Sequence, residues 1–345
     1  MSSRRVDRYA AAGVRADAAD EAKRRIAELV RSTRTSLAAG HIGAFGGMVR
    51  LPAGYRAPLL VMSTDGVGTK VLVAAAAGRH DTVGEDLVNH CVNDILVHGA
   101  QPLAFLDYLA AGSLDPAVAE ALVAGIARAC RAHDMTLVGG ETAQLPDLYQ
   151  PGHYDLAGTI VGVVEEAAAI HGDRVAVGDA LIGYASSGLH TNGYTLARRI
   201  VFDELRLGID DPFPETDQTV GQVLLAVHRS YAAAVRPVVA RLHALAHVTG
   251  GGIPGNLARV VPAGCEAVVN AGTWPWPPLF RVLMRAGRVS LDEMRRVFNI
   301  GVGLIAAAAR DDVEGAVQAA ERAGVRAWII GEIHPGRGGV RFAER

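Results

Sequence analysis

Short apolar runs alternate with amphipathic segments through the first half of the chain. Leucine and β-branched residues dominate the runs, and turn residues follow them, as is typical of buried strands. The runs lie at residues 57–64, 103–110, 135–142 and 154–164. Between them, residues 82–98 and 113–133 carry apolar side chains at helical spacing, and Asp115 and Pro116 suit a helix start. This alternation predicts an α/β fold.

The second half repeats the mixture of strands and helices. Turn residues around Ile170 precede a fresh apolar run, so we place a domain boundary there and predict domains 1–170 and 171–345. A length of 345 residues suits two domains. The strands expected in the second half lie at residues 180–185, 265–270, 301–309 and 327–333, and the helices at 194–205, 220–245 and 312–323.

Composition excludes several classes of protein. The net charge is −2 and no long basic run exists, which argues against nucleic acid as a partner. The three cysteines form no CxxC pair, so neither a disulfide framework nor a cysteine zinc site is indicated. We see no secretory leader and no apolar stretch long enough for a bilayer. We therefore expect a soluble, cytoplasmic protein that acts on small molecules and binds no membrane.

The stretch STDGVGTK follows the first strand and contains the ingredients of a phosphate site. The order Gly68-Thr69-Lys70 differs from the Walker order, which has lysine before the hydroxyl residue, so this is not a P-loop. Gly66 and Gly68 permit close approach of a ligand, Lys70 could meet a phosphate, and Asp65 could hold Mg²⁺. An ordinary strand-ending turn with a solvated acid and base is the alternative.

Other polar turns repeat this theme. The glycine-rich segment 38–52 could close over a ligand or be a plain connector. Asp94 lies at the edge of the apolar stripe of the helix at 82–98, where a carboxylate needs a metal, a donor or a cation. Together with Glu141 in the turn GGET, Asp65 and Asp94 would suit Mg²⁺ on a nucleoside triphosphate. His190, in SSGLHTNGYT, could be a general acid or base, a phosphate ligand or a structural residue.

The segment DILVHGAQP matches the D-x4-G-A-x-P pattern of the ATP-dependent synthetases that include aminoimidazole ribonucleotide synthetase. The blocks STDGVGTK, CVNDILVHGAQPLAFLDY, LVGGETAQLPDLY, YDLAGTIVGVVE, SSGLHTNGYTL, HVTGGGIPGN and FNIGVGL follow in the same order over nearly the whole chain. In this order the chain resembles the phosphoribosylformylglycinamidine cyclo-ligase family of de novo purine biosynthesis.

The resemblance implies a fold and a reaction. It implies an N-terminal α/β domain whose strands help to build a barrel across a homodimer, a C-terminal α/β domain, and an ATP cleft between them. The enzyme would be a ligase that closes formylglycinamidine ribonucleotide to 5-aminoimidazole ribonucleotide, with ADP and phosphate as products, through an iminophosphate. ATP and Mg²⁺ would be required, and whether K⁺ assists stays open.

The resemblance also assigns roles to residues of the matching blocks. The metal ligands would be Asp65, Asp94 and Glu141. The catalytic residues would be Lys70, His190 and Asn192. Nucleotide binding would involve Gly43, Gly46, Gly47, Asp65, Gly66, Gly68, Thr69, Lys70, Asp94, Gly139, Gly140, Glu141 and Thr142. The substrate would contact Ser187, Gly188, His190, Thr191, Asn192, Gly251, Gly252 and Asn256.

Some positions depart from the family pattern, and some alternatives remain. Arg15, Ala44 and Gly255 differ from the usual residues, and VHRSY around His228 stands where the family usually has PTRIY. Another synthetase or kinase of the superfamily is one alternative. A selenophosphate synthetase would usually carry a cysteine in the glycine loop, and a hydrogenase-maturation relative would end in one; this chain has neither. A non-catalytic nucleotide sensor would have lost the acidic and lysine positions, which are present here.

Overall fold

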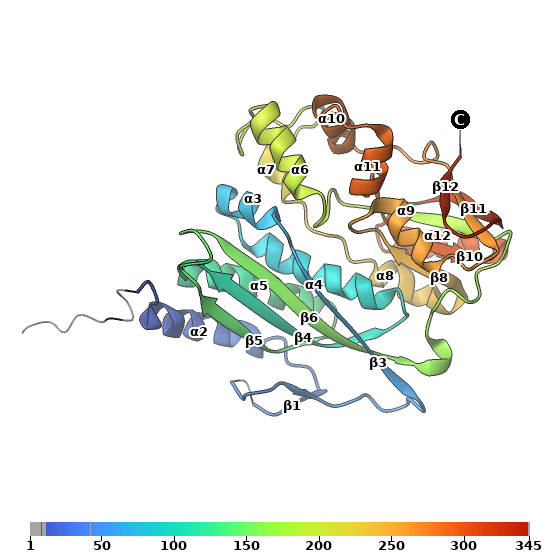
Figure 1. The fold of residues 1–345 in the computed structure, drawn as a ribbon. Helices are drawn as coiled ribbons and strands as arrows, with labels where there is room; N and C mark the ends of the chain where they lie inside the picture. The colour runs from blue at the N-terminus through green and yellow to red at the C-terminus, as the bar shows by residue number, and fades with distance from the viewer. Residues whose placement is uncertain (1–7, 9–11, 42, 344–345) are drawn as a thin grey trace, which may run out of the picture.

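Two large mixed β-sheets organise the chain, one in each half (Figure 1). The structure, a computed structural model, describes residues 8, 12–41 and 43–343. Helices pack beside both sheets, as the alternating pattern predicted, and the α/β fold class is confirmed. No described helix is long and apolar enough to cross a membrane.

The sheet of the amino-terminal half has four strands in the order β3-β6-β4-β5. Their bounds are Pro58–Gly66 for β3, Gln101–Ala111 for β4, Thr136–Gln144 for β5 and Tyr154–Glu165 for β6. The β3–β6 and β6–β4 pairs are antiparallel and the β4–β5 pair is parallel. Strand β3 therefore lies at one edge of the sheet and β5 at the other.

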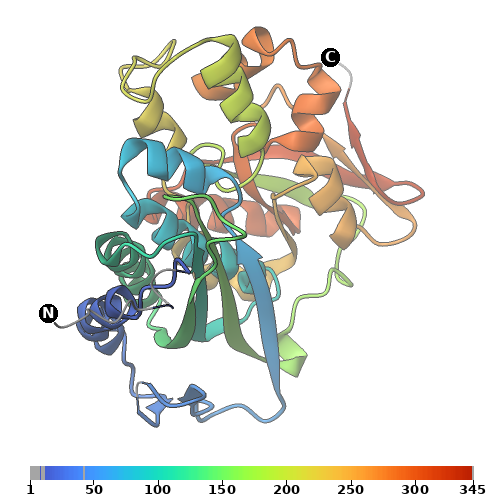
Figure 2. The same cartoon turned by 60° about the vertical axis from the view of Figure 1, so that its left-hand side comes forward.

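Helices cover one face of this sheet and leave the other open (Figure 2). Helices α4 (Asp81–Leu96) and α5 (Pro116–Ala132) pack on the covered face, and α2 (Ala16–Arg31) packs on α5. Asp115 caps α5 by accepting a hydrogen bond from the Ala117 amide, as its position predicted. The open face exposes Leu60, Met62 and Tyr108.

Helices α4 and α5 cross at two glycines. A Cβ atom at Gly84 would collide with the Leu122 carbonyl, and one at Gly125 would collide with the Asp81 carbonyl. Only glycine lets the two backbones approach so closely. Helix α4 is thereby fixed against the rest of the amino-terminal half, and its other side faces the carboxyl-terminal half (Figure 1).

The sheet of the carboxyl-terminal half has six strands in the order β12-β9-β11-β7-β10-β8. Only the β12–β9 pair is parallel. The strands are β7 (Ala180–Ala185), β8 (Leu242–His247), β9 (Cys265–Val269), β10 (Val302–Ala308), β11 (Ala327–Pro335) and β12 (Val340–Phe342). The helices are α6 (Tyr194–Arg198), α7 (Val220–Leu224), α8 (Ala232–Val235), α9 (Gly252–Leu257), α10 (Pro278–Ala286), α11 (Leu291–Val297) and α12 (Val313–Arg322).

One predicted helix is wrong. Instead of a single helix over 220–245, the chain forms α7, an irregular segment at 226–231, α8, a 3₁₀ turn and strand β8. Pro237 lies in the first turn of the 3₁₀ segment, and the short, almost wholly buried run Leu242–His247 suits a strand in the core. The 226–231 segment is held by side chains of α4, which a local reading of the sequence could not reveal. The predicted helix at 194–205 is α6 continued by a π-helical turn, Arg199–Glu204.

Candidate active site

A cavity of about 400 Å³ lies between the two halves. The amino-terminal half contributes the end of β3 and the end of α4, and the carboxyl-terminal half contributes β8, the loop after it and α9. Polar and charged residues of its lining are Ser63, Asp65, Asp94, His98, His171, His247, Thr249, Asn256 and Arg259. The cavity thus combines carboxylates on one wall with a guanidinium and amide group on the other.

The carboxylates of Asp65 and Asp94 converge on one buried imidazole. His90 Nε2 lies 2.7 Å from Asp65 Oδ2 and 3.7 Å from Asp94 Oδ2. Ser63 Oγ donates to Asp94 Oδ2 over 3.0 Å, and the Gly66 amide donates to Asp65 Oδ1 over 2.7 Å. Asp65 comes from the end of β3, and Asp94 lies one helical turn after His90 on α4, which is why these groups meet.

Both carboxylates are held in the ionised form. Burial alone would raise the pKa of Asp65. The hydrogen bond with His90 and the positive charge of His90 lower this pKa overall. Burial likewise acts to raise the pKa of Asp94, and the bond from His247 lowers it overall. Burial acts to lower the pKa of His90, but the carboxylates of Asp65 and Asp94 raise it overall. Two carboxylates and one imidazolium leave a patch of net negative charge beside the cavity, which attracts cations.

This patch fits a hard divalent cation. His90 Nε2 faces one oxygen of each carboxylate, Asp65 Oδ2 and Asp94 Oδ2. An ionised carboxylate has about four acceptor sites, so both groups keep lone pairs for a further ligand. Mg²⁺ is typically bound by one or two carboxylates together with phosphate oxygens. Asp65 and Asp94 supply that donor set.

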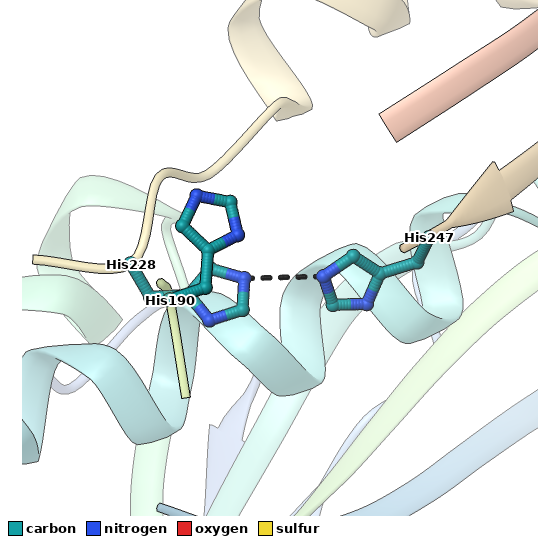
Figure 3. A group of neighbouring side chains, drawn as sticks. All are labelled: His190, His228 and His247. Atoms are coloured by element: carbon teal, nitrogen blue, oxygen red, sulfur yellow. Dashed lines mark hydrogen bonds between the residues drawn. The ribbon is translucent and has the colours of Figure 1, made fainter. Parts of the chain in front are cut away.

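The imidazoles of His190, His228 and His247 lie close together (Figure 3). His247 Nδ1 contacts Asp94 Oδ1 at 2.8 Å, and its Nε2 lies 3.1 Å from His228 Nε2. Thr191 Oγ1 contacts His90 Nδ1 at 2.6 Å and His228 Nδ1 at 3.3 Å. His190 stacks on His228 with 4.0 Å between ring centroids. These polar groups join the two halves beneath the cavity.

Helix α4 positions His228 through a polar stripe. Asp86 Oδ1 accepts from the His228 amide at 2.6 Å, and Asn89 Nδ2 donates to the His228 carbonyl at 2.8 Å. Asn93 Nδ2 donates to the Arg229 carbonyl at 2.8 Å, and its Oδ1 accepts from the Tyr231 amide at 2.9 Å. The irregular 226–231 segment forms no regular helix or strand, and these side chains of α4 supply the hydrogen bonds that its backbone amides and carbonyls need.

Lys70 does not reach the cavity. Its side chain is fully buried, and Nζ lies 2.7 Å from Asp86 Oδ2. Nζ also donates to the carbonyls of His190 and Ala226, over 3.1 and 2.8 Å. Every direction open to the ammonium group is thereby occupied. The prediction that Lys70 contacts a phosphate is at odds with this placement, because a sequence pattern does not show which way a side chain turns.

Glu141 lies apart from the other two predicted metal ligands. Across the sheet, Asp65 on β3 lies opposite Gly158 on β6, and Gly158 lies opposite Asp107 on β4. Asp107 in turn lies opposite Gly140 on β5. Glu141 is the next residue, and side chains alternate between faces, so it belongs to the open face. It also lies three strand spacings from Asp65, roughly 14 Å at ~4.8 Å each. The structure thus does not bring Glu141 into one site with Asp65 and Asp94 within a single chain.

The remaining predicted nucleotide-binding residues fall into two groups. Gly66, Gly68 and Thr69 follow Asp65 at and after the end of β3, and none of the three lines the cavity. The others belong to β5 or to the glycine loop near it, since Gly47 lies against Val138. This second group consists of Gly43, Gly46, Gly47, Gly139, Gly140, Glu141 and Thr142. Because β3 and β5 are opposite edges, the two groups do not share a pocket within one chain.

The predicted substrate turns are placed on either side of the buried histidines. Asn256 lines the cavity and ties its own loop together by donating to the Gly252 carbonyl over 2.8 Å. Gly251 and Gly252 have positive φ, which gives this loop its shape. The second turn lies deeper: Ser187 Oγ donates to the Val227 carbonyl, and His190 is almost fully buried. This turn also contains Gly188, Thr191 and Asn192.

Sequence reasoning missed several residues of the site. His247 and Arg259 line the cavity, and His90 lies between the carboxylates, but none of them stood out in the sequence. A signal did exist for α4, since Asp86, Asn89 and Asn93 recur at helical spacing opposite its apolar stripe. Such a polar stripe on an otherwise apolar helix indicates buried polar partners.

Comparison with known proteins gives two family matches and many full-length relatives. The family described as AIR synthase related protein, N-terminal domain, matches residues 46–164, and its C-terminal domain matches residues 176–343. A relative from Sorangium cellulosum is 48% identical over 341 residues, 98% of each chain. One from Trichlorobacter lovleyi is 48% identical over 328 residues, 94% of each chain. Both carry the name phosphoribosylformylglycinamidine cyclo-ligase.

Solved structures share the fold at lower identity. Thiamine-monophosphate kinase from Stenotrophomonas maltophilia superposes with a TM-score of 0.71 at 20% identity, covering 92% of this chain and 95% of its own. The hydrogenase maturation protein HypE in complex with ATP gives a TM-score of 0.62 at 20% identity, covering 96% of this chain and 92% of its own. At such identities the likeness shows the fold alone.

Proposed function

The chain belongs to the phosphoribosylformylglycinamidine cyclo-ligase family, and from this premise we infer that it is an ATP-dependent ligase of purine biosynthesis. Identities of 48% over nearly the full length, together with both family domains, confirm the resemblance drawn from the motifs. The enzyme closes formylglycinamidine ribonucleotide to 5-aminoimidazole ribonucleotide and converts ATP to ADP and phosphate.

The reaction proceeds through an iminophosphate intermediate, in which the phosphoryl group of ATP activates the formyl oxygen as a leaving group. The formyl oxygen of the substrate attacks the γ-phosphorus of ATP, the bond to ADP breaks, and the formyl carbon becomes an activated imidate. The neighbouring amidine nitrogen then attacks that carbon, and phosphate leaves with the former formyl oxygen. Loss of a proton from the attacking nitrogen, and transfer of one proton from the ring methylene to the exocyclic imine nitrogen, complete the aromatic 5-aminoimidazole. Positioning and charge neutralisation, not a protein nucleophile, are what such phosphoryl transfer requires of the enzyme.

The anionic wall of the cavity between the two halves is the observation that supports locating the active site there. Asp65 and Asp94 are ionised and converge within a cavity of about 400 Å³. We assign them as the residues that would hold Mg²⁺, which when bound neutralises phosphate charge. Arg259 and Asn256 on the opposite wall would orient the nucleotide or the substrate phosphate.

Other residues receive revised roles. We assign to Lys70 a structural role, in which it holds the turn at His190 and the 226–231 segment in place. Its ammonium group pairs with Asp86 and donates to two carbonyls, so it has no donor left for a phosphate. His190 would position the same turn from within, with Asn192 beside it. Ser187, Gly188 and Thr191 would shape the substrate side of that turn.

Glu141 and the β5 glycines call for a second chain. They lie near the open face, which exposes Leu60, Met62 and Tyr108, and exposed apolar surface of this kind marks an interface. We assign this face to a homodimer, in which the β5 edge would serve a nucleotide site that one chain does not complete. The domain boundary remains at residues 170 and 171, within the connector between β6 and β7.

A direct assay tests the function. Purified protein would be incubated with ATP, Mg²⁺ and formylglycinamidine ribonucleotide, and 5-aminoimidazole ribonucleotide and ADP would be quantified. We expect equal amounts of both products, and none without ATP. Replacing the substrate with thiamine monophosphate or selenide would test the other activities of the superfamily. Turnover of either, with no aminoimidazole product, would contradict the assignment.

A further inference from the structure

The segment FNIGVGL lies against the turn at 186–192, which contains predicted substrate residues. The side chain of Asn299 in this segment is buried and joins the two. Its Nδ2 donates to the Gly188 carbonyl over 2.8 Å, and its Oδ1 accepts from the Ser186 hydroxyl over 3.0 Å and from the Gly301 amide over 2.9 Å. The Ser186 amide in turn donates to the Gly301 carbonyl over 2.9 Å. The segment and the turn therefore form one unit.

Both parts of this unit contain strained backbone. The described residues other than glycine with positive φ are Asp134, His190, Arg206, Glu215, Arg288 and Ile300. Four of them are polar or charged residues at exposed positions, whereas His190 at 66° and Ile300 at 43° are almost completely buried. Positive φ is a true outlier for a β-branched residue such as Ile300. Strain of this kind persists only where neighbours fix it, and it concentrates at functional sites.

Neighbouring groups hold both strained residues in place. Trp274 Nε1 donates to the Ile300 carbonyl over 2.9 Å. Lys70 Nζ donates to the His190 carbonyl over 3.1 Å. Gly303 leaves room for the His190 ring, because a Cβ atom at this position would collide with it. The middle of the turn is thus packed directly against the backbone of β10.

The far end of the turn lies between the two walls of the cleft. A Cβ atom at Gly68 would lie 3.6 Å from the Thr191 carbonyl oxygen, and one at Gly250 would lie 3.4 Å from Asn192 Oδ1. Gly68 comes just after β3 and Gly250 just after β8, and both strands contribute to the cavity. Within the described part of the chain, Asn192 Nδ2 makes one contact, a long one of 3.5 Å to Thr191 Oγ1. The Asn192 amide is the polar group of the turn that remains to meet a ligand.

We propose that Asn299 is a positioning residue for formylglycinamidine ribonucleotide, an inference that rests on the function proposed above. By holding the Gly188 carbonyl, Asn299 fixes the start of the turn, and the packing of His190 fixes its middle. Asn192 is then presented to the substrate in one orientation. Because the turn is shaped before the substrate arrives, less free energy is lost to ordering when the substrate binds.

Substrate binding by Asn299 variants tests the proposal. Asn299→Ser and Asn299→Asp both keep an acceptor for the Gly301 amide, and neither has an amide to donate to the Gly188 carbonyl. We expect each variant to bind formylglycinamidine ribonucleotide about 10-fold more weakly, measured by calorimetry without ATP, because a buried carbonyl loses its donor. KM for this substrate should rise by a similar factor, and KM for ATP should change by less than about twofold.

Two further variants complete the experiment. Ser186→Ala is a milder change that removes one bond to Asn299, and it should raise the same KM by about threefold. Asn270→Ser is the matched control, because Asn270 Oδ1 also accepts from the amide of a glycine two residues on, Gly272, over 2.9 Å. Asn270 is exposed and does not contact the turn at 186–192. This control should bind and convert the substrate as the wild type does.

The pattern of kinetic changes separates positioning from a purely structural role. A structural role alone would lower kcat in proportion to the folded fraction seen in thermal melting and would leave both KM values unchanged. That result, or a change confined to the aspartate variant, would overturn the proposal. A wild type that neither binds nor cyclises formylglycinamidine ribonucleotide would overturn the proposed function itself, and this inference with it.

Discussion

Lys70 and Asp86 form an ion pair, 2.7 Å from Nζ to Oδ2, from which solvent is completely excluded. The contact is one of charge, because Asp86 Oδ2 makes no well-aligned hydrogen bond. Lys70 also holds two carbonyls of the carboxyl-terminal half, and Asp86 holds the His228 amide. The pair therefore belongs to the junction between the halves, and both partners depend on each other for compensation of their charge.

We expect Lys70→Met to lower the free energy of unfolding by about 3–5 kcal/mol, because it leaves the Asp86 carboxylate buried without a counter-charge. Urea denaturation followed by fluorescence and circular dichroism would measure this loss. The double variant Lys70→Met/Asp86→Leu should recover much of it, since a buried apolar pair needs no compensation. A double variant no more stable than Lys70→Met would show that the two charges are not coupled.

The same pair predicts a pH dependence of stability. Burial is the main cause that raises the pKa of Asp86, from 3.8 to about 6. The folded state then binds this proton more tightly than the unfolded state, so ionisation opposes folding. We expect the free energy of unfolding to fall by up to about 3 kcal/mol as pH rises from about 4 to about 6. Subtracting the pH profile of the Lys70→Met/Asp86→Leu variant isolates this effect. A flat or rising difference over that range would refute it.

Turnover should depend on both cavity carboxylates. We expect Asp65→Asn and Asp94→Asn each to lower kcat by ~10²-fold or more, because each removes a charge that would hold Mg²⁺ near the phosphates. Thermal melting should show that both variants remain folded. Glu120→Gln is the matched control, since Glu120 pairs with Arg25 on the surface far from the cavity. Near wild-type turnover in either aspartate variant would remove that residue from the site.

The path of one oxygen atom tests the mechanism. Substrate labelled with ¹⁸O at the formyl group should yield labelled inorganic phosphate and unlabelled imidazole, because the formyl oxygen leaves with the phosphoryl group. Mass spectrometry of both products would follow the label. If the label appeared in water and the phosphate stayed unlabelled, ATP hydrolysis and ring closure would be separate events.

The open sheet face should mediate dimerisation. Met62 is 62% exposed and Leu60 is 49% exposed on this face. We expect sedimentation of the wild type to show a dimer at micromolar concentration, and Met62→Glu to shift it to monomer by placing a charge in the apolar interface. Leu291→Glu, at an exposed leucine of the other half, is the control and should leave the dimer intact. A monomeric wild type would refute the interface.

The strands were predictable because their residues favour extended backbone whatever they pack against. The run at 57–64 and the run at 154–164 became β3 and β6, since branched and apolar side chains favour strands. The expected burial of the first run is wrong, because β3 lies at the edge of the sheet and exposes Leu60 and Met62. The helix expected over 220–245 failed for the opposite reason. Its middle section takes its hydrogen bonds from Asp86, Asn89 and Asn93, more than a hundred residues earlier in the chain.

The site was predictable in part. Asp65 and Asp94 were identified from turns and helix position, and they do meet. Glu141 was grouped with them because its turn looked alike, but strand order and the alternation of faces separate it. Lys70 is predicted from its motif to contact a phosphate, and only tertiary structure shows that it turns inward to Asp86. Spacing within a motif thus locates an element end, whereas strand register and partner elements decide where each side chain points.

The close crossing of α4 and α5 restricts how the cleft can open. Gly84 and Gly125 lie against main-chain atoms of the opposite helix, so neither helix can slide or roll along the other without collision. The wall that carries Asp94 therefore moves with the four-stranded sheet as one piece. Buried hydrogen bonds from Asp86, Asn89 and Asn93 tie the 226–231 segment of the carboxyl-terminal half to the same helix. A nucleotide entering the cavity therefore meets two walls that share one rigid support, helix α4.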